Sequence, residues 1–144
     1  MVEKDAVIER QHYKGLAWVA SMALFMQSLD ATILNTALPT IATDLQTPVF
    51  EMQMAIIAYS LAVALFIPLT AWAAAKFGTL TVFRSAVFTF VFGSVACAMA
   101  TSLEALVLAR ILQGIGGAFM MPVARLAIIQ TVPKNQLINA WNLM

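Results

Sequence analysis

The chain has 144 residues, of which 62 % are hydrophobic and only 10 % charged, and its mean hydropathy is +0.88. Soluble domains carry about 25 % charged residues, so this composition excludes an ordinary water-soluble protein and favours one built for lipid. A net charge of +1 without a basic patch argues against a nucleic-acid partner, and the single cysteine, Cys97, excludes a disulfide framework. The sequence indicates no cofactor and no metal site.

The chain begins with a polar segment of mixed charge, residues 1–14, which we predict to be a cytoplasmic tail. Long apolar runs follow, and each is long enough for a helix to cross about 30 Å of hydrocarbon. They do not alternate as the strands of a membrane barrel do. The sequence therefore predicts an all-α membrane protein with four transmembrane helices, at 15–39, 52–75, 82–103 and 105–129. Residues 130–144 are expected to form a cytoplasmic segment and the start of a fifth helix.

Three prolines lie within or beside these runs. Pro39 is expected to mark the outer end of the first span. Pro68 predicts a kink in the second span, which neighbouring groups must compensate by binding the freed carbonyl. Pro122 is expected to bend the fourth span or to end its regular part.

The basic residues are distributed unevenly among the loops. Seven of the eight lie in the tail, at or beside the connection between spans two and three, or near the end of span four and beyond it, and the loops on the other side have none. Cytoplasmic loops of membrane proteins carry an excess of Lys and Arg. We therefore expect the N-terminus and the end of span four to face the cytoplasm, with the seven residues being Lys4, Arg10, Lys14, Lys76, Arg84, Arg125 and Lys134.

Two charged residues lie deep within the apolar spans. With a rise of 1.5 Å per residue, Asp30 lies roughly 13 Å below the outer end of span one at Pro39. Arg110 lies roughly 9 Å below the outer end of span four, near Glu104. Charges at such depth usually face a bundle interior or a water-filled cavity. Because the two depths agree within one helical turn, the sequence predicts an ion pair, or two charges facing one cavity.

Helical periodicity assigns the other polar residues of these spans to faces. On span one, Asp30 and Gln27 project from nearly the opposite side to the stripe of Ser21, Ser28, Thr32 and Asn35. This helix is therefore expected to lie between other helices or beside a cavity. On span four, Arg110 shares a stripe with Gln113, Gly114, Gly117, Met121 and Arg125. The glycines of "QGIGGA", which include Gly116, predict close helix packing.

Two stretches resemble the signatures of a known family. "LDATILNTALP" and "RILQGIGGA" are similar to the first-helix and fourth-helix signatures of the major facilitator superfamily, and more specifically of its fourteen-helix drug:proton antiporters in bacterial inner membranes. The resemblance runs from about residue 15 onward. It implies that Asp30 is the acidic first-helix position of proton coupling or substrate contact and that Arg110 is the arginine of proton transfer. Asn35 lies within the first signature, and Gln113 with the glycines would support Arg110.

The loop between spans two and three departs from this family. The resemblance calls for a sequence close to G-x-L-A-D-x-x-G-R-[RK], whereas residues 71–84 read "AWAAAKFGTLTVFR". Only Gly78 remains, with Lys76 and Arg84 nearby. That loop normally stabilises one conformation by charge pairing, so this cytoplasmic gating loop is degenerate.

The resemblance implies a proton-coupled exporter of drugs or other small hydrophobic compounds, whose partners are membrane lipid, substrate and protons. Its members have twelve or fourteen helices in two bundles, so we interpret the chain as an N-terminal fragment whose C-terminal helices are missing. Two alternatives remain open: a complete four-helix small multidrug transporter acting as a dimer, and a non-transporting membrane subunit. An enzyme is not expected, since no nucleophile–base pair or metal-ligand spacing is present.

Overall fold

The computed structural model describes residues 2–131, and these residues form α-helices joined by short turns. The helices are α1 (Val2–Asp44), α2 (Val49–Phe66), α3 (Leu69–Phe77), α4 (Thr79–Ala98) and α5 (Leu103–Thr131). This confirms the all-α class. Residues 132–144, expected to include the start of a further helix, lie outside the described residues.

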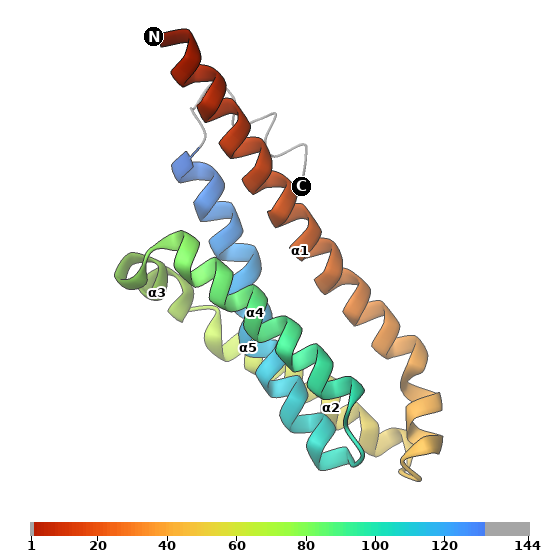
Figure 1. The fold of residues 1–144 in the computed structure, drawn as a ribbon. Coiled ribbons are helices and arrows are strands. Elements are labelled where there is room, and N and C mark those ends of the chain that lie inside the picture. The colour runs from red at the N-terminus through yellow and green to blue at the C-terminus, as the bar shows by residue number, and fades with distance from the viewer. Residues whose placement is uncertain (1, 132–144) are drawn as a thin grey trace.

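Within residues 2–131, four helical stretches are long and apolar enough to cross a membrane, as the composition predicted. They are Ala17–Asp44, Val49–Phe66, Thr79–Ala98 and Leu103–Ala127. The N-terminal part of α1 continues the first stretch without a break and extends beyond the bundle (Figure 1). The chain is therefore a multi-pass membrane protein.

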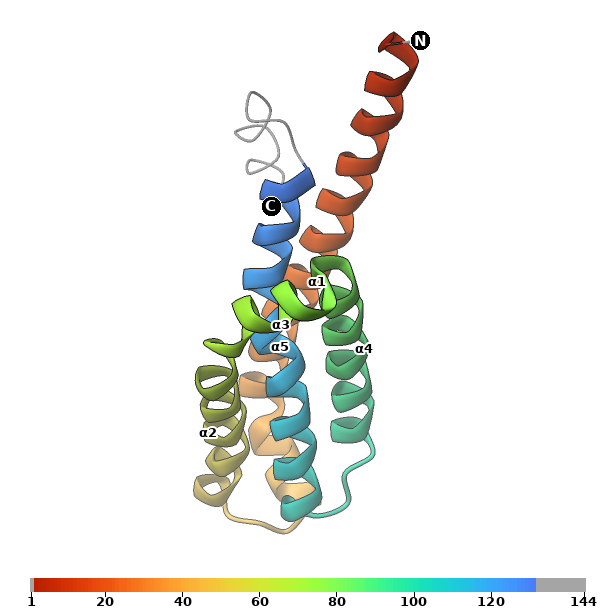
Figure 2. The same cartoon turned by 90° about the vertical axis from the view of Figure 1, so that its left-hand side faces the viewer.

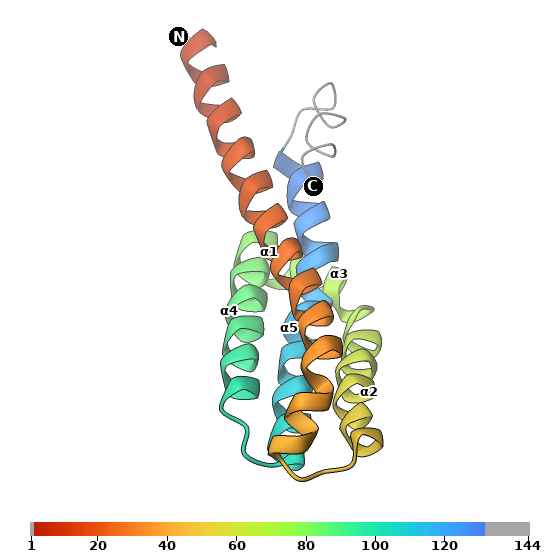
Figure 3. The same cartoon turned by 90° about the vertical axis from the view of Figure 1, so that its right-hand side faces the viewer.

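Helix α5 is the central element of the bundle. It lies between α2 and α4 in two views (Figures 2 and 3) and contacts each of the other four helices. The short turns that join α1 to α2 and α4 to α5 lie at the same end, opposite to the N-terminus. Short connections of this kind make successive spans antiparallel neighbours. A larger share of α5 is therefore buried inside the bundle than of the other three membrane-spanning stretches.

Pro68 separates α2 from α3, so residues 52–75 fold as two helices rather than one kinked helix. Proline has no backbone N–H and its ring disturbs the preceding turn. The carbonyl of Ile67 is satisfied by Thr70, whose backbone N–H and hydroxyl both donate to it, at 3.1 and 2.8 Å. Thr70 is buried. Figure 2 shows that α3 changes direction at this break and crosses towards α4.

The other two prolines do not end their helices. Helix α1 continues through Pro39 to Asp44, five residues beyond the expected end, and α5 continues through Pro122 to Thr131. A proline removes one helical hydrogen bond, and a membrane helix tolerates this when packing holds the adjacent turns. Beyond Pro39 the buried side chain of Ala42 supplies such packing.

The buried side chains form two apolar clusters. The first lies around Phe90 and Met120 and contains Ala20, Ala23, Ala73, Val82, Phe83, Ala86, Phe90, Met120, Val123 and Ala124. The second contains Leu34, Leu38, Ala42, Met52, Ala55 and Leu106. Many of these residues are small, so helices approach closely by van der Waals packing, which is the main attraction available in lipid.

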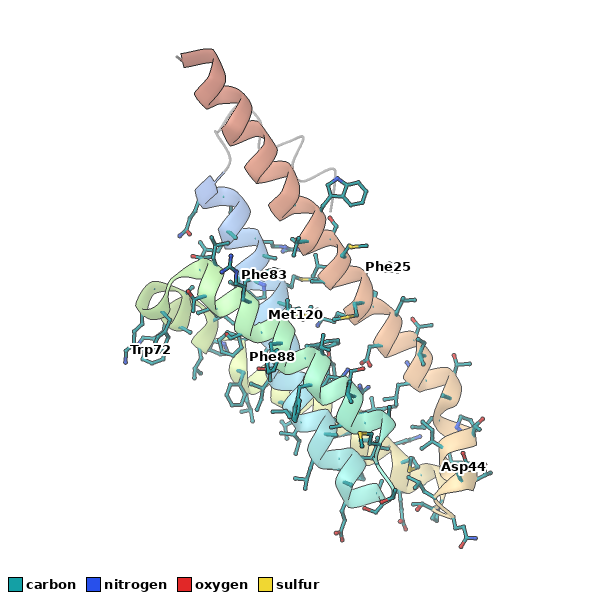
Figure 4. All side chains as sticks on the ribbon, viewed as in Figure 1. Phe25, Asp44, Trp72, Phe83, Phe88 and Met120 are labelled. Carbon is teal, nitrogen blue, oxygen red and sulfur yellow. The ribbon has the colours of Figure 1, made fainter. Side chains whose placement is uncertain are left out.

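Large apolar side chains also cover the outside of the bundle. Phe25, Trp72 and Phe88 are more than half exposed and point outward, whereas Phe83 and Met120 lie between helices (Figure 4). So many exposed apolar side chains would favour aggregation in water. They are the expected surface of a protein whose solvent is hydrocarbon.

Gly116 lies at a close approach between α5 and α4. A Cβ atom at Gly116 would lie 2.6 Å from the backbone nitrogen of Phe90 and 2.8 Å from the carbonyl oxygen of Ala86. Both neighbours are backbone atoms, which cannot move aside as a flexible side chain can. The glycine is therefore needed for this helix contact.

We predict that Gly116→Ala lowers the free energy of unfolding by about 1–3 kcal/mol, because the added methyl group forces α4 and α5 apart. Gly15→Ala is the matched control, since a Cβ at Gly15 meets nothing within 4 Å. Thermal unfolding in detergent measures both. Equal melting temperatures for the two variants would contradict the close contact.

Candidate functional site

A layer of polar side chains crosses the middle of the bundle. Helix α1 supplies Gln27 and Asp30, α2 supplies Tyr59, and α5 supplies Arg110 and Gln113. Asp30 lies near the centre of the membrane-spanning stretch Ala17–Asp44. Residues three apart on a helix share a face, which is why α1 and α5 each present two polar groups to this layer.

Asp30 and Arg110 form the ion pair that their matched depths predict. Arg110 Nη1 donates to Asp30 Oδ2 at 2.7 Å, and Gln113 Nε2 donates to Asp30 Oδ1 at 2.8 Å. Arg110 Nη1 also donates to Gln113 Oε1. Each oxygen of the carboxylate thus has its own donor, and the three side chains form a closed triangle.

The triangle is shielded from its surroundings. Arg110 is 3 % exposed and Gln113 is fully buried, while the side chain of Asp30 is 19 % exposed. The second apolar cluster lies on one side of the layer along α1 and α5, and the first apolar cluster lies on the other. Removing one partner of such a pair leaves an uncompensated buried charge, which costs far more than the pair contributes.

Tyr59 and Gln27 complete the layer beside Arg110. The guanidinium carbon of Arg110 lies 4.9 Å from the centre of the Tyr59 ring, over its face. Gln27 Nε2 donates to the Tyr59 hydroxyl at 3.2 Å and to the carbonyl oxygen of Gly117 at 3.5 Å. Sequence reasoning missed Tyr59. The available signal was its depth, since a tyrosine far from the membrane interfaces needs a polar partner for its hydroxyl.

Two atoms of the layer retain unused hydrogen-bonding capacity. Among the side chains that the structure describes, Gln27 Oε1 and Arg110 Nε are buried without a partner. Buried polar atoms of this kind are rare in folded proteins, and each needs an explanation. Cys97 is half-buried, and its thiol donates to Gln113 Oε1 at 3.5 Å.

Two of the three glycines of α5 face α2, and the third faces α4. A Cβ at Gly114 would lie 2.7 Å from the carbonyl oxygen of Tyr59, and one at Gly117 would lie 2.9 Å from the Tyr59 hydroxyl. Gly116 faces α4 instead. The geometry agrees with the expected close packing, and it shows in addition that two of the glycines accommodate one residue of α2.

The structure does not bring Asn35 into this layer. Asn35 lies five residues after Asp30, which turns it about 140° around the helix, and it is exposed. Ser28 and Thr32 are exposed on the same stripe, and the Thr32 hydroxyl donates to the Ser28 carbonyl at 3.0 Å. Part of α1 therefore presents polar groups that its neighbouring helices leave uncovered.

The residues of the degenerate loop lie at the junction of α3 and α4. Gly78 has φ = +87°, which favours glycine, and it joins the two helices. Lys76 is exposed, with Nζ 4.9 Å above the Trp72 ring. Arg84 is exposed on α4. These residues contribute no atom to the triangle around Asp30.

A buried acid–base triangle in the middle of an all-α membrane bundle is typical of membrane transporters. Comparison with known proteins gives the family: the Major Facilitator Superfamily matches residues 20–144. The chain belongs to this family of membrane transporters, which are not enzymes.

Individual relatives are also similar to the chain. "Probable transport protein HsrA" of Haemophilus influenzae is 83 % identical over 136 residues, covering 94 % of this chain and 29 % of that protein. "Putative multidrug resistance protein MdtD" of Yersinia pestis and of Yersinia pseudotuberculosis is 46 % identical over 119 residues, covering 83 % of the chain and 26 % of each. The "FMQSLD" and "NTALP" strings of the chain resemble multidrug resistance proteins of this D type. The chain spans less than a third of these relatives, and no solved structure matches it.

We predict that Arg110→Gln alone lowers the free energy of unfolding by about 3–5 kcal/mol, because it leaves the Asp30 carboxylate buried without its cation. The double variant Asp30→Asn/Arg110→Gln should lose less than the sum of the two single losses. Thermal unfolding in detergent measures the cycle. Arg84→Gln, which removes an exposed charge, is the control and should change stability by no more than about 0.5 kcal/mol.

Proposed function

We propose that this chain forms the first helices of a proton-coupled transporter that exports drugs or other small hydrophobic compounds. The observation that carries this proposal is the Asp30–Arg110–Gln113 triangle at mid-span. An ionisable group at this depth is a functional-site candidate by default, because such groups are costly in a membrane span and mark ion or substrate pathways. The names of the relatives, a transport protein and a multidrug resistance protein, support a role in transport and leave proton coupling as part of the proposal.

The proposed coupling is a proton transfer at the Asp30 carboxyl group. When an oxygen of Asp30 binds a proton, the carboxylate loses its negative charge and its ion pair with Arg110. Gln113 Nε2 remains able to donate to the other oxygen. Release of the proton restores the ion pair. The ion pair between α1 and α5 is therefore present in one protonation state of Asp30 and absent in the other. Proton binding can then shift the equilibrium between two arrangements of these helices.

The substrate is proposed to contact the exposed polar stripe of α1. Asn35, together with Ser28 and Thr32, offers hydrogen-bonding groups on a face that is otherwise apolar. A small hydrophobic compound with a few polar atoms suits such a surface. In the whole transporter, the remaining helices would enclose this face. We also propose that Lys76, Gly78 and Arg84, at the junction of α3 and α4, belong to a cytoplasmic gating loop. The membrane is proposed to be the bacterial inner membrane.

In proteoliposomes with an internal pH-sensitive dye, the full-length Asp30→Asn variant should lose substrate-driven proton movement completely, because an amide cannot take up the proton. The control Thr43→Val removes an exposed hydroxyl of α1 outside the layer and should couple normally. Normal coupling in Asp30→Asn would overturn the proposal.

A non-transporting subunit, in which Asp30 and Arg110 only hold the helices together, makes a different prediction. There the double variant Asp30→Asn/Arg110→Gln would keep its function, since no unpaired charge remains. In a transporter the double variant stays inactive although it folds. Transport assays on the folded double variant separate the two readings.

The proposed orientation is tested by labelling with a membrane-impermeant maleimide in a Cys97→Ser background. Gln46→Cys, in the exposed turn between α1 and α2, should be labelled from outside intact cells. Lys76→Cys, exposed near the end of α3, should be labelled only after the inner membrane is opened. The reverse pattern would place the N-terminus outside.

A further inference from the structure

Neighbouring helices contact Tyr59 at its hydroxyl and at its backbone. Its hydroxyl accepts from Gln27 Nε2 of α1, and its backbone carbonyl lies where a Cβ at Gly114 of α5 would collide with it. Gly117 leaves the space that the hydroxyl occupies, since a Cβ there would lie 2.9 Å away. The ring therefore has a defined place between α1 and α5, and that place is against Arg110.

Protonation of Asp30 changes the electrostatic surroundings of the Arg110 guanidinium. The guanidinium is 3 % exposed and would lose its counter-ion while remaining buried. A buried cation without compensation is strongly unfavourable. Two contacts of Arg110 do not depend on the charge of Asp30: the hydrogen bond to Gln113 Oε1 and the face of the Tyr59 ring. An aromatic face attracts a cation most strongly when both are desolvated.

We propose that Tyr59 is the positioning residue that keeps the Arg110 guanidinium in the polar layer while Asp30 carries a proton, and that Gly114 and Gly117 form the space that holds Tyr59 there. This inference rests on the proposed function. It assigns to α2 a part in coupling, through the π face of one side chain rather than through a charge.

The test compares Tyr59→Leu with Tyr59→Phe in the full-length transporter reconstituted in proteoliposomes. Leucine removes the aromatic face, so kcat of proton-coupled transport should fall roughly tenfold, as the loss of a desolvated cation–π contact implies. The KM for substrate should stay unchanged, because Tyr59 contacts Arg110 and not the stripe of Asn35. Phenylalanine keeps the face and should retain kcat within about threefold.

Phe66→Leu is the matched control. Phe66 is also an aromatic residue of α2, and its ring meets that of Phe119 on α5, at a centroid distance of 6.5 Å, away from the polar layer. It should transport normally. Normal kcat in Tyr59→Leu, or an equal loss in Phe66→Leu or in Tyr59→Phe, would overturn the inference.

A second measurement separates this inference from the proposed function. In thermal unfolding, Tyr59→Leu and Arg110→Gln should be non-additive, which reports their contact without reference to transport. Additive effects overturn the inference whatever the transport data show. Non-additive effects together with normal coupling in Asp30→Asn would overturn the proposed function and leave Tyr59 as a partner of Arg110.

Discussion

The rest of the bundle is organised around one buried charge pair. A carboxylate in the middle of a membrane span costs about 2.5–3.5 kcal/mol on insertion scales, so it needs a partner at the same depth. Arg110 is that partner, and its own requirements bring in Gln113 and Tyr59. Two apolar clusters then close the layer from either side. The positions of α1, α2 and α5 relative to one another follow from these polar contacts.

Helix α5 carries both the polar side chains of the layer and the glycines that allow close helix packing. One of its faces carries Arg110 and Gln113, and its glycines permit α2 and α4 to approach within a distance that any other residue would prevent. Small residues make close contact possible, and close contact makes short hydrogen bonds to α1 possible. We expect a proton-coupled transporter to need both the close contact and the hydrogen bonds, because loosely packed helices cannot convert the binding of one proton into a defined movement.

Much of this arrangement could be predicted from the sequence, and the rest could not for physical reasons. Hydropathy located the spans, and the rise per residue matched Asp30 with Arg110, because both depend on local geometry. Tyr59 was missed, since its role depends on which face of α2 meets α5, and an apolar span gives no periodicity from which to read that face. The helix break at Pro68 was expected only as a kink, because the sequence did not reveal that α3 would turn away from α2 and cross towards α4.

The unbroken length of α1 has a mechanical consequence. Asp30 stands roughly 20 Å from each end of the stretch Ala17–Asp44, so the charge pair holds this membrane-spanning stretch close to its midpoint. If the helix tilts about this point, its two ends move in opposite directions. A tilt of about 10° would move each end by roughly 3.5 Å. In the proposed transporter, protonation of Asp30 would act at the point about which this helix tilts.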